Sequence, residues 1–120
     1  QDEPDDFCIA TGVQHTVRDF VNFAWGHVGK IIRWEGEGTK EKGYDQETGK
    51  LIVSVDPRYF RSTEVETLLG DPTKARETLG WVPKISLDEM VHEMMENDIS
   101  IAKRDVFLKE QGFKAYNHNE

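Results

Sequence analysis

The run Asp6-Phe7-Cys8-Ile9-Ala10-Thr11-Gly12, followed by the segment from Thr16 to Gly29, decides the fold class. Residues 7–10 are apolar and stop at Thr11-Gly12, which predicts a short buried strand that ends in a turn. Thr16 and the acidic residue three positions later predict a helix start, and apolar residues recur along one helical stripe as far as Val28. Gly29 is placed to end this helix in a left-handed conformation. A strand, a turn and a helix in this order indicate an α/β fold.

The rest of the chain continues this alternation. Residues 30–35 and 51–56 have the β-branched and aromatic composition of strands. Between them, residues 36–50 are rich in glycine and charge, so we expect a solvent-exposed excursion there.

Two helices are predicted after the strand at residues 51–56. A short one covers residues 72–79, with Asp71 as its N-cap, Pro72 at its first position and Gly80 as its stop. The last helix begins at the capping box formed by Ser86 and Glu89, and its apolar stripe includes three methionines that we expect to fill a core.

Length and composition limit the function. A chain of 120 residues holds one domain, and its net charge of −8 disfavours binding to a phosphate backbone. No apolar run is long enough to span a membrane, and the acidic start resembles neither a signal nor a transit peptide. The single cysteine, Cys8, lies in an apolar run and is predicted to be a buried thiol of a protein in the reducing cytoplasm.

Motifs that would carry chemistry are incomplete. The stretch Gly36-Glu37-Gly38 lacks the third glycine and the following helix of a dinucleotide site, and Gly38 to Gly43 lacks the Lys-Ser/Thr of a P-loop. His92-Glu93-Met94-Met95-Glu96 has glutamate where a zinc-protease helix has its second histidine, and the other histidines share no ligand-like spacing with it. We therefore predict no catalytic, cofactor-binding or metal-ligating residue in this chain.

One segment does suggest a binding site. Asp56-Pro57-Arg58-Tyr59-Phe60-Arg61-Ser62-Thr63-Glu64 follows a strand and carries two arginines and a glutamate in an acidic chain. Arginines at a strand end suit a bidentate clamp on phosphate oxygens, and a nearby carboxylate can accept hydrogen bonds from sugar hydroxyls. The alternative is that Arg61 and Glu64 pair with each other or with other surface charges. Residue chemistry alone leaves both interpretations open.

Three stretches together resemble a known family. They are residues 6–12, residues 53–75, which contain Arg61-Ser62-Thr63-Glu64-Val65-Glu66-Thr67-Leu68-Leu69-Gly70-Asp71, and Leu79-Gly80-Trp81-Val82-Pro83. They closely resemble the C-terminal third of the GDP-mannose 4,6-dehydratases, a family of the extended short-chain dehydrogenase/reductases. The likeness runs from Asp2 to about Gly112. The segment from Arg61 to Asp71 is specific to that family, whereas Leu-Gly-Trp-x-Pro is shared more widely.

The resemblance implies a fold and an activity. The chain would be a small mixed α/β substrate-binding lobe covering residues 1–110, with the last Rossmann-type strand near residues 7–10 and a polar tail at 111–120. The Rossmann domain would be largely absent. The parent enzyme would be a lyase that converts GDP-mannose to GDP-4-keto-6-deoxy-mannose with tightly bound NADP, on the route to GDP-fucose. Its catalytic and cofactor-binding residues would lie in the missing Rossmann part, so this chain alone would be inactive and bind no cofactor.

The resemblance also assigns individual residues. Arg61 would contact the GDP diphosphate and Glu64 a ribose hydroxyl, while Arg58 is a weaker substrate-binding candidate for which we expect a structural role. The family usually has proline where this chain has Ser62, which would loosen the presentation of Arg61 because proline restricts φ. The parent enzyme would form a homodimer or homotetramer, largely through its Rossmann part.

Two other functions remain open. A nucleotide-sugar epimerase or 4-keto-reductase of the same superfamily would share most of these features. A non-catalytic nucleotide-sugar-binding module is the non-enzymatic alternative.

Overall fold

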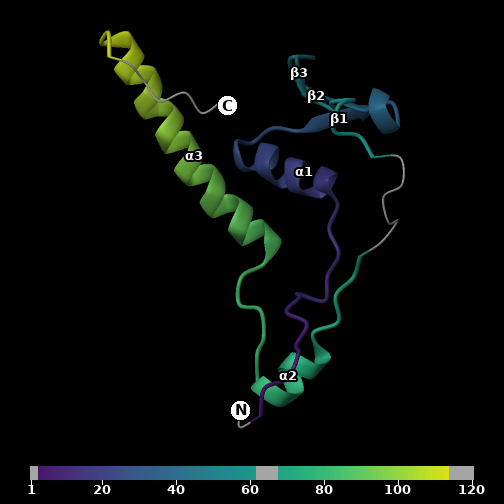
Figure 1. The fold of residues 1–120 in the computed structure, drawn as a ribbon. Helices are drawn as coiled ribbons and strands as arrows, with labels where there is room; N and C mark the ends of the chain where they lie inside the picture. Colours follow the sequence, from purple (N-terminus) through teal and green to yellow (C-terminus); the bar gives the residue numbers. More distant parts are fainter. Residues whose placement is uncertain (1–2, 62–67, 114–120) are drawn as a thin grey trace.

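The described part of the chain folds into three α-helices and one small antiparallel sheet (Figure 1). The computed structural model describes residues 3–61 and 68–113. The helices are α1 (Val17–His27), α2 (Thr73–Leu79) and α3 (Leu87–Glu110), and the strands are β1 (Ile32–Glu35), β2 (Lys42–Asp45) and β3 (Leu51–Ser54). A short 3-10 helix, η1 (Gly38–Lys40), joins β1 to β2. The predicted mixed α/β class is confirmed.

Helix α1 begins and ends where the sequence predicts. Thr16 accepts a hydrogen bond from the Asp19 backbone N–H, and the Asp19 carboxylate accepts one from the Thr16 backbone, which completes a capping box. At the other end Gly29 has φ 74° and its N–H donates to Gly26 O, while the N–H of Lys30 donates to Trp25 O. These two bonds form a Schellman motif, which satisfies the last carbonyls of the helix.

The sheet has the order β1-β2-β3, and its central strand lies where the sequence predicts only an exposed excursion. The prediction of an exposed excursion over residues 36–50 is therefore wrong at β2, in which Gly43 and Asp45 are buried. The reason is the packing of Gly43: a Cβ there would stand 3.0 Å from Ile32 Cγ2 and 3.1 Å from Trp34 Cζ3. Side chains of β1 cover this glycine, so the strand needs no apolar residue of its own.

Residues 7–10 were predicted to be a buried strand, and this is wrong for the described chain. They belong to no strand, and Cys8 is exposed. A strand requires a neighbour that completes its hydrogen bonds, and no described strand lies beside this segment. The segment instead passes residues 70–74: a Cβ on Gly70 would lie 2.5 Å from Ala10 Cβ, and Lys74 Nζ donates to Asp6 O at 3.0 Å. The further prediction that this segment joins a Rossmann-type sheet in the complete enzyme is not tested by the described residues and stays a prediction.

The two later helices largely match their predicted bounds. Gly80 ends α2 in the left-handed region, with φ 65°, but the N-cap position is Pro72 and not Asp71. The Asp71 carboxylate nevertheless accepts a hydrogen bond from the Thr73 N–H at 2.9 Å. Ser86 and Glu89 form the predicted capping box of α3, which ends at Glu110, next to the predicted start of the tail.

The molecule is open and has little core. Among the described residues, the buried apolar side chains are Ile32, Ala75 and Val91. The accessible surface is 10,242 Å², whereas a compact protein of 13.8 kDa exposes about 6,600 Å². Figure 1 shows why: α2 and the N-terminal segment lie at one end, and α1 lies between the sheet and the long helix α3.

No described helix combines the length and the apolar character that crossing a membrane would require.

Candidate functional site

The turn after β3 is built around Asp56. Its backbone carbonyl accepts a hydrogen bond from the Tyr59 N–H at 3.1 Å, and its Oδ1 accepts one from the Arg58 N–H at 2.9 Å. Pro57 restricts φ at the next position, which favours this tight geometry. The turn directs the chain away from the sheet immediately before Arg61.

The side chain of Arg58 contacts other residues of this turn. Its Nη2 donates to Asp56 Oδ2 at 2.6 Å, and this contact with the guanidinium lowers the pKa of Asp56. The guanidinium carbon also stands 5.5 Å from the centre of the Tyr59 ring. These contacts are those of a turn-stabilising residue, which is the structural role expected for Arg58. They do not test its candidacy as a substrate ligand.

Arg61 lies exposed at the end of the described segment, next to Phe60. The ring of Phe60 packs towards η1, with its Cζ 4.0 Å from where a Cβ on Gly38 would stand. The predicted partner Glu64 and the divergent residue Ser62 lie outside the described residues. The structure therefore places Arg58 and Arg61 in one exposed turn, and the pairing of Arg61 with Glu64 stays a prediction.

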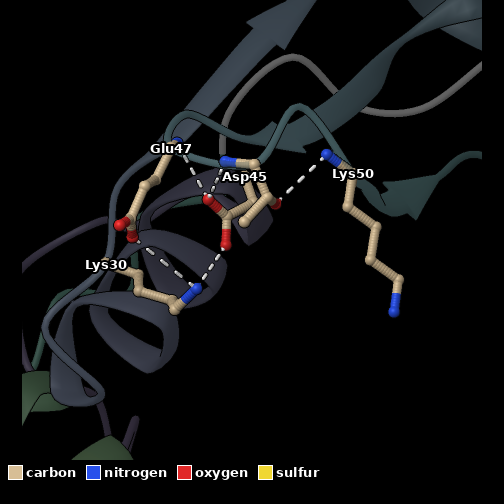
Figure 2. A network of polar contacts seen from close by, with 5 residues as sticks. Lys30, Asp45, Glu47 and Lys50 are labelled. Atoms are coloured by element: carbon tan, nitrogen blue, oxygen red, sulfur yellow. Dashed lines mark hydrogen bonds and ion pairs between the residues drawn. The ribbon is translucent and has the colours of Figure 1, made fainter.

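A polar network lies at the end of β2, at the opposite end of the β2–β3 hairpin from this turn (Figure 2). Asp45 is 2% exposed, and its Oδ2 accepts a hydrogen bond from Lys30 Nζ at 2.8 Å. Its Oδ1 accepts the backbone N–H groups of Glu47 and Thr48 at 2.9 and 3.1 Å. Lys30 lies just beyond α1, so this one carboxylate joins the helix to the β2–β3 hairpin.

Electrostatics favour the charged form of both groups in this network. The hydrogen bond to Lys30, with those from the two backbone N–H groups, lowers the pKa of Asp45. The same carboxylate raises the pKa of Lys30. Sequence reasoning missed Asp45, although Asp45-Gln46-Glu47-Thr48-Gly49 between two β-prone stretches is a hairpin signal.

Helix α1 is fastened to the sheet by polar contacts at its edges. Arg18 forms an ion pair with Glu41, and its guanidinium lies 5.4 Å from the centre of the Trp34 ring. Trp34 Nε1 donates to Asn22 Oδ1 at 2.9 Å. Between these contacts is a cavity of about 420 Å³, lined mainly by apolar atoms of α1 and the sheet. The sheet and α1 thus form a unit that carries the turn with Arg58 and Arg61.

A larger cavity, of about 650 Å³, lies between residues 11–15 and the start of α3. Val13, Ile85 and Met90 give it an apolar wall, and Glu89 and Glu93 stand on its lining. Neither arginine of the predicted site lines it. Carboxylates repel a diphosphate, so this cavity is not suited to the phosphate end of a nucleotide sugar.

The described residues do not form a cradle for a dinucleotide. Gly36 has φ 80°, and a Cβ there would lie 2.5 Å from Lys40 O, so this glycine serves a tight turn into η1 and not a helix N-terminus. The carboxylates of Asp19 and Glu89 each accept the backbone N–H of the N-cap residue of their helix, α1 and α3, and Asp71, just before α2, accepts the Thr73 N–H. A carboxylate at a helix start places negative charge where a pyrophosphate would bind, which disfavours that binding.

Elsewhere, His27, His92 and Glu96 gather between α1 and α3 with their potential ligand atoms within 4.8 Å of one another.

Comparisons with known proteins give a consistent result. The family model described as GDP-mannose 4,6 dehydratase matches residues 1–94. GDP-mannose 4,6 dehydratase 2 of Caenorhabditis elegans is 54% identical over 105 residues, which cover 88% of this chain and 27% of that protein. GDP-mannose 4,6-dehydratase of Vibrio cholerae is 46% identical over 122 residues, covering 93% and 33% respectively. The human protein named GDP-mannose 4,6 dehydratase is 49% identical over 102 residues, covering 85% and 27%.

The match therefore covers most of this chain but only about a third of each relative's length.

Proposed function

This chain belongs to the GDP-mannose 4,6-dehydratase family, and from that premise we propose that it forms the substrate-side lobe of an enzyme that removes water from GDP-mannose. The observation that carries the proposal is the identity of about half of all residues to proteins of that name along nearly the whole chain. The open structure supports it, because a surface of 10,242 Å² is that of a partial domain.

Within this lobe we assign Arg61 to the diphosphate and Glu64 to a ribose hydroxyl. The support for Arg61 is its exposed position after a turn that Asp56 and Arg58 stabilise by their own contacts. The planar guanidinium fits phosphate oxygens in a bidentate manner. Arg58 contributes indirectly, by holding the turn.

The redox cofactor of the proposed reaction, NADP, does not fit the described residues. At each of the three helix starts a carboxylate accepts a backbone N–H, and the glycine-rich stretch at 36–38 turns into η1. We therefore propose that the cofactor and the residues that act on the sugar belong to a part of the enzyme outside this chain, and we derive no chemical step from the residues present.

The test uses the full-length gene product with GDP-mannose and NADP. The substitution Arg61→Ala is expected to raise KM for GDP-mannose by roughly 30- to 150-fold, because a charge-assisted contact contributes about 2–3 kcal/mol. The matched control is Arg33→Ala, since Arg33 is also exposed but pairs with Glu35 on the sheet. An unchanged KM in Arg61→Ala would remove Arg61 from the site, and the absence of any conversion by the unaltered protein would refute the dehydratase proposal.

The alternatives are distinguished by product and by affinity. Given GDP-mannose, an epimerase would release a sugar nucleotide that retains its C6 oxygen, and a 4-keto-reductase would form no product because GDP-mannose has no C4 carbonyl. The proposed dehydratase yields a 6-deoxy product. The names of the relatives favour the dehydratase. A stand-alone nucleotide-sugar-binding module would bind GDP-mannose with micromolar affinity as the isolated 120-residue chain. We expect only weak binding there, measured by calorimetry, because half of the cleft would be missing.

The proposed setting is a cytoplasmic homodimer or homotetramer. The compartment is supported by a single cysteine, Cys8, which has no partner within this chain for a disulfide.

A further inference from the structure

We propose that His27 and His92 bind a divalent transition-metal ion of the zinc class, which links the end of α1 to the second turn of α3. The two histidines are 65 residues apart, and their Nδ1 atoms are 2.9 Å from each other. Their ring centres are 4.5 Å apart with the planes at 75°. Two imidazole nitrogens this close to each other can supply two of the ligands of a zinc-class ion.

Glu96 determines which nitrogen of His27 is available. His27 Nε2 lies 2.9 Å from Glu96 Oε1, and because a carboxylate only accepts, Nε2 carries the hydrogen. In the neutral ring the lone pair is then on Nδ1, which points towards His92. A carboxylate that orients a histidine in this way is the usual second partner of a metal-bound imidazole. His92 and Glu96 are four residues apart on α3, which puts both on the face that meets α1.

Little movement is needed to admit the ion. Two nitrogens bound to zinc at the usual 2.0–2.1 Å in a tetrahedron are about 3.4 Å apart, so the present separation must open by about half an ångström. Without the ion, the hydrogen on His92 Nδ1 bridges the two rings. Metal binding moves that hydrogen to Nε2 of His92, which is exposed and exchanges with solvent. We expect water to complete the coordination, because His92 is exposed.

The surrounding charge favours a cation. Residues 87–102 of α3 contain no lysine or arginine but carry five carboxylates, namely Asp88, Glu89, Glu93, Glu96 and Asp98. His27 is the last residue of α1, where the helix dipole places partial negative charge. The site joins two helices of a chain with a sparse core, so bound metal would stabilise the docking of α1 on α3.

The test titrates the full-length gene product with zinc chloride by calorimetry. One zinc equivalent should be lost in His27→Gln and in His92→Gln, and its affinity should fall about tenfold or more in Glu96→Gln. The matched control is His15→Gln, since His15 is exposed and lies outside the cluster, and it should bind zinc as the unaltered protein does. Unchanged binding in His27→Gln and His92→Gln would overturn the proposal.

A second measurement needs no substitution. Diethyl pyrocarbonate acylates accessible imidazole nitrogens, and mass spectrometry locates the modified residues. Zinc should protect His92 at least tenfold while leaving the modification of His15 unchanged. Equal modification of His92 with and without zinc would refute the site even if a variant failed to fold.

Discussion

Single residues decide where the elements of this lobe meet. Asp45 is the clearest case: one buried carboxylate binds Lys30 beyond α1 and two backbone N–H groups of the β2–β3 turn (Figure 2). Gly43, two residues earlier, lets the side chains of Ile32 and Trp34 cross the sheet surface above it. Neither residue has an apolar side chain, and each nevertheless fixes a contact within the sheet or between α1 and the β2–β3 hairpin.

The Asp45 network predicts a pH dependence. The hydrogen bonds from Lys30 and the backbone donors lower the pKa of Asp45 in the folded chain. The ionised Asp45 carboxylate therefore stabilises the fold above its unfolded-state pKa of about 3.9, and this contribution is lost as the pH falls through the folded-state pKa. Asp45→Asn should therefore lower the urea midpoint at pH 7, and the difference from the unaltered protein should shrink below pH 4. Glu37→Gln, at an exposed position, is the control. A difference independent of pH would contradict this assignment.

The close packing around Gly43 predicts that one added methyl group destabilises the fold. Gly43→Ala puts a Cβ 3.0–3.3 Å from atoms of Ile32 and Trp34, and we expect it to cost about 1–3 kcal/mol of unfolding free energy. Gly26→Ala adds the same group in α1 with no atom within 4 Å, and should stabilise by about 0.5–1 kcal/mol. Denaturant unfolding of both variants checks this, and equal effects at the two positions would refute it.

At the scale of elements, local signals predicted the helices better than the sheet. The capping boxes at Thr16 and Ser86 and the stops at Gly29 and Gly80 are made by residues within six positions of each other, so they are visible in the sequence. Strand β2 was missed because its burial comes from residues of β1, not from its own hydropathy. The segment 7–10 was wrongly predicted as a buried strand because its composition does not reveal whether a neighbouring strand is present.

The capping box of α3 is expected to contribute to the stability of the fold. Ser86→Ala removes the side chain that accepts the Glu89 N–H at 3.2 Å, and should cost about 1 kcal/mol. Ser100→Ala, in the middle of the same helix, lacks that role and should leave stability unchanged or slightly higher. Thermal unfolding monitored by circular dichroism compares the two, and an equal loss in both variants would show that the cap contributes nothing specific.

At the scale of the whole molecule, the chain has more apolar surface than its own core uses. Its radius of gyration is 19.3 Å, whereas a compact chain of this length has about 14 Å. Met90 and Met94 are 42% and 44% exposed, so the prediction that the α3 methionines fill a core is wrong for these two. The reason is that α1 covers only part of α3 among the described elements.

This surface predicts the behaviour of the 120-residue chain by itself. We expect it to self-associate as its concentration rises, because exposed apolar faces of this extent favour burial against a second molecule. Analytical ultracentrifugation over a hundredfold concentration range measures this directly. A monodisperse monomer throughout would mean that the open arrangement closes on itself in solution.

The sequence by itself determined the family, the mixed α/β class, the caps of α1 and α3, and the turn that carries Arg58 and Arg61. These depend on residues that are close together in the chain, or on identity along it. Only the tertiary structure decided that β2 is the central strand, that Cys8 is exposed, that Asp45 joins α1 to the hairpin, and that His27 meets His92 and Glu96. Each of those depends on which distant segments come to lie side by side, and spacing within a single sequence carries no record of that.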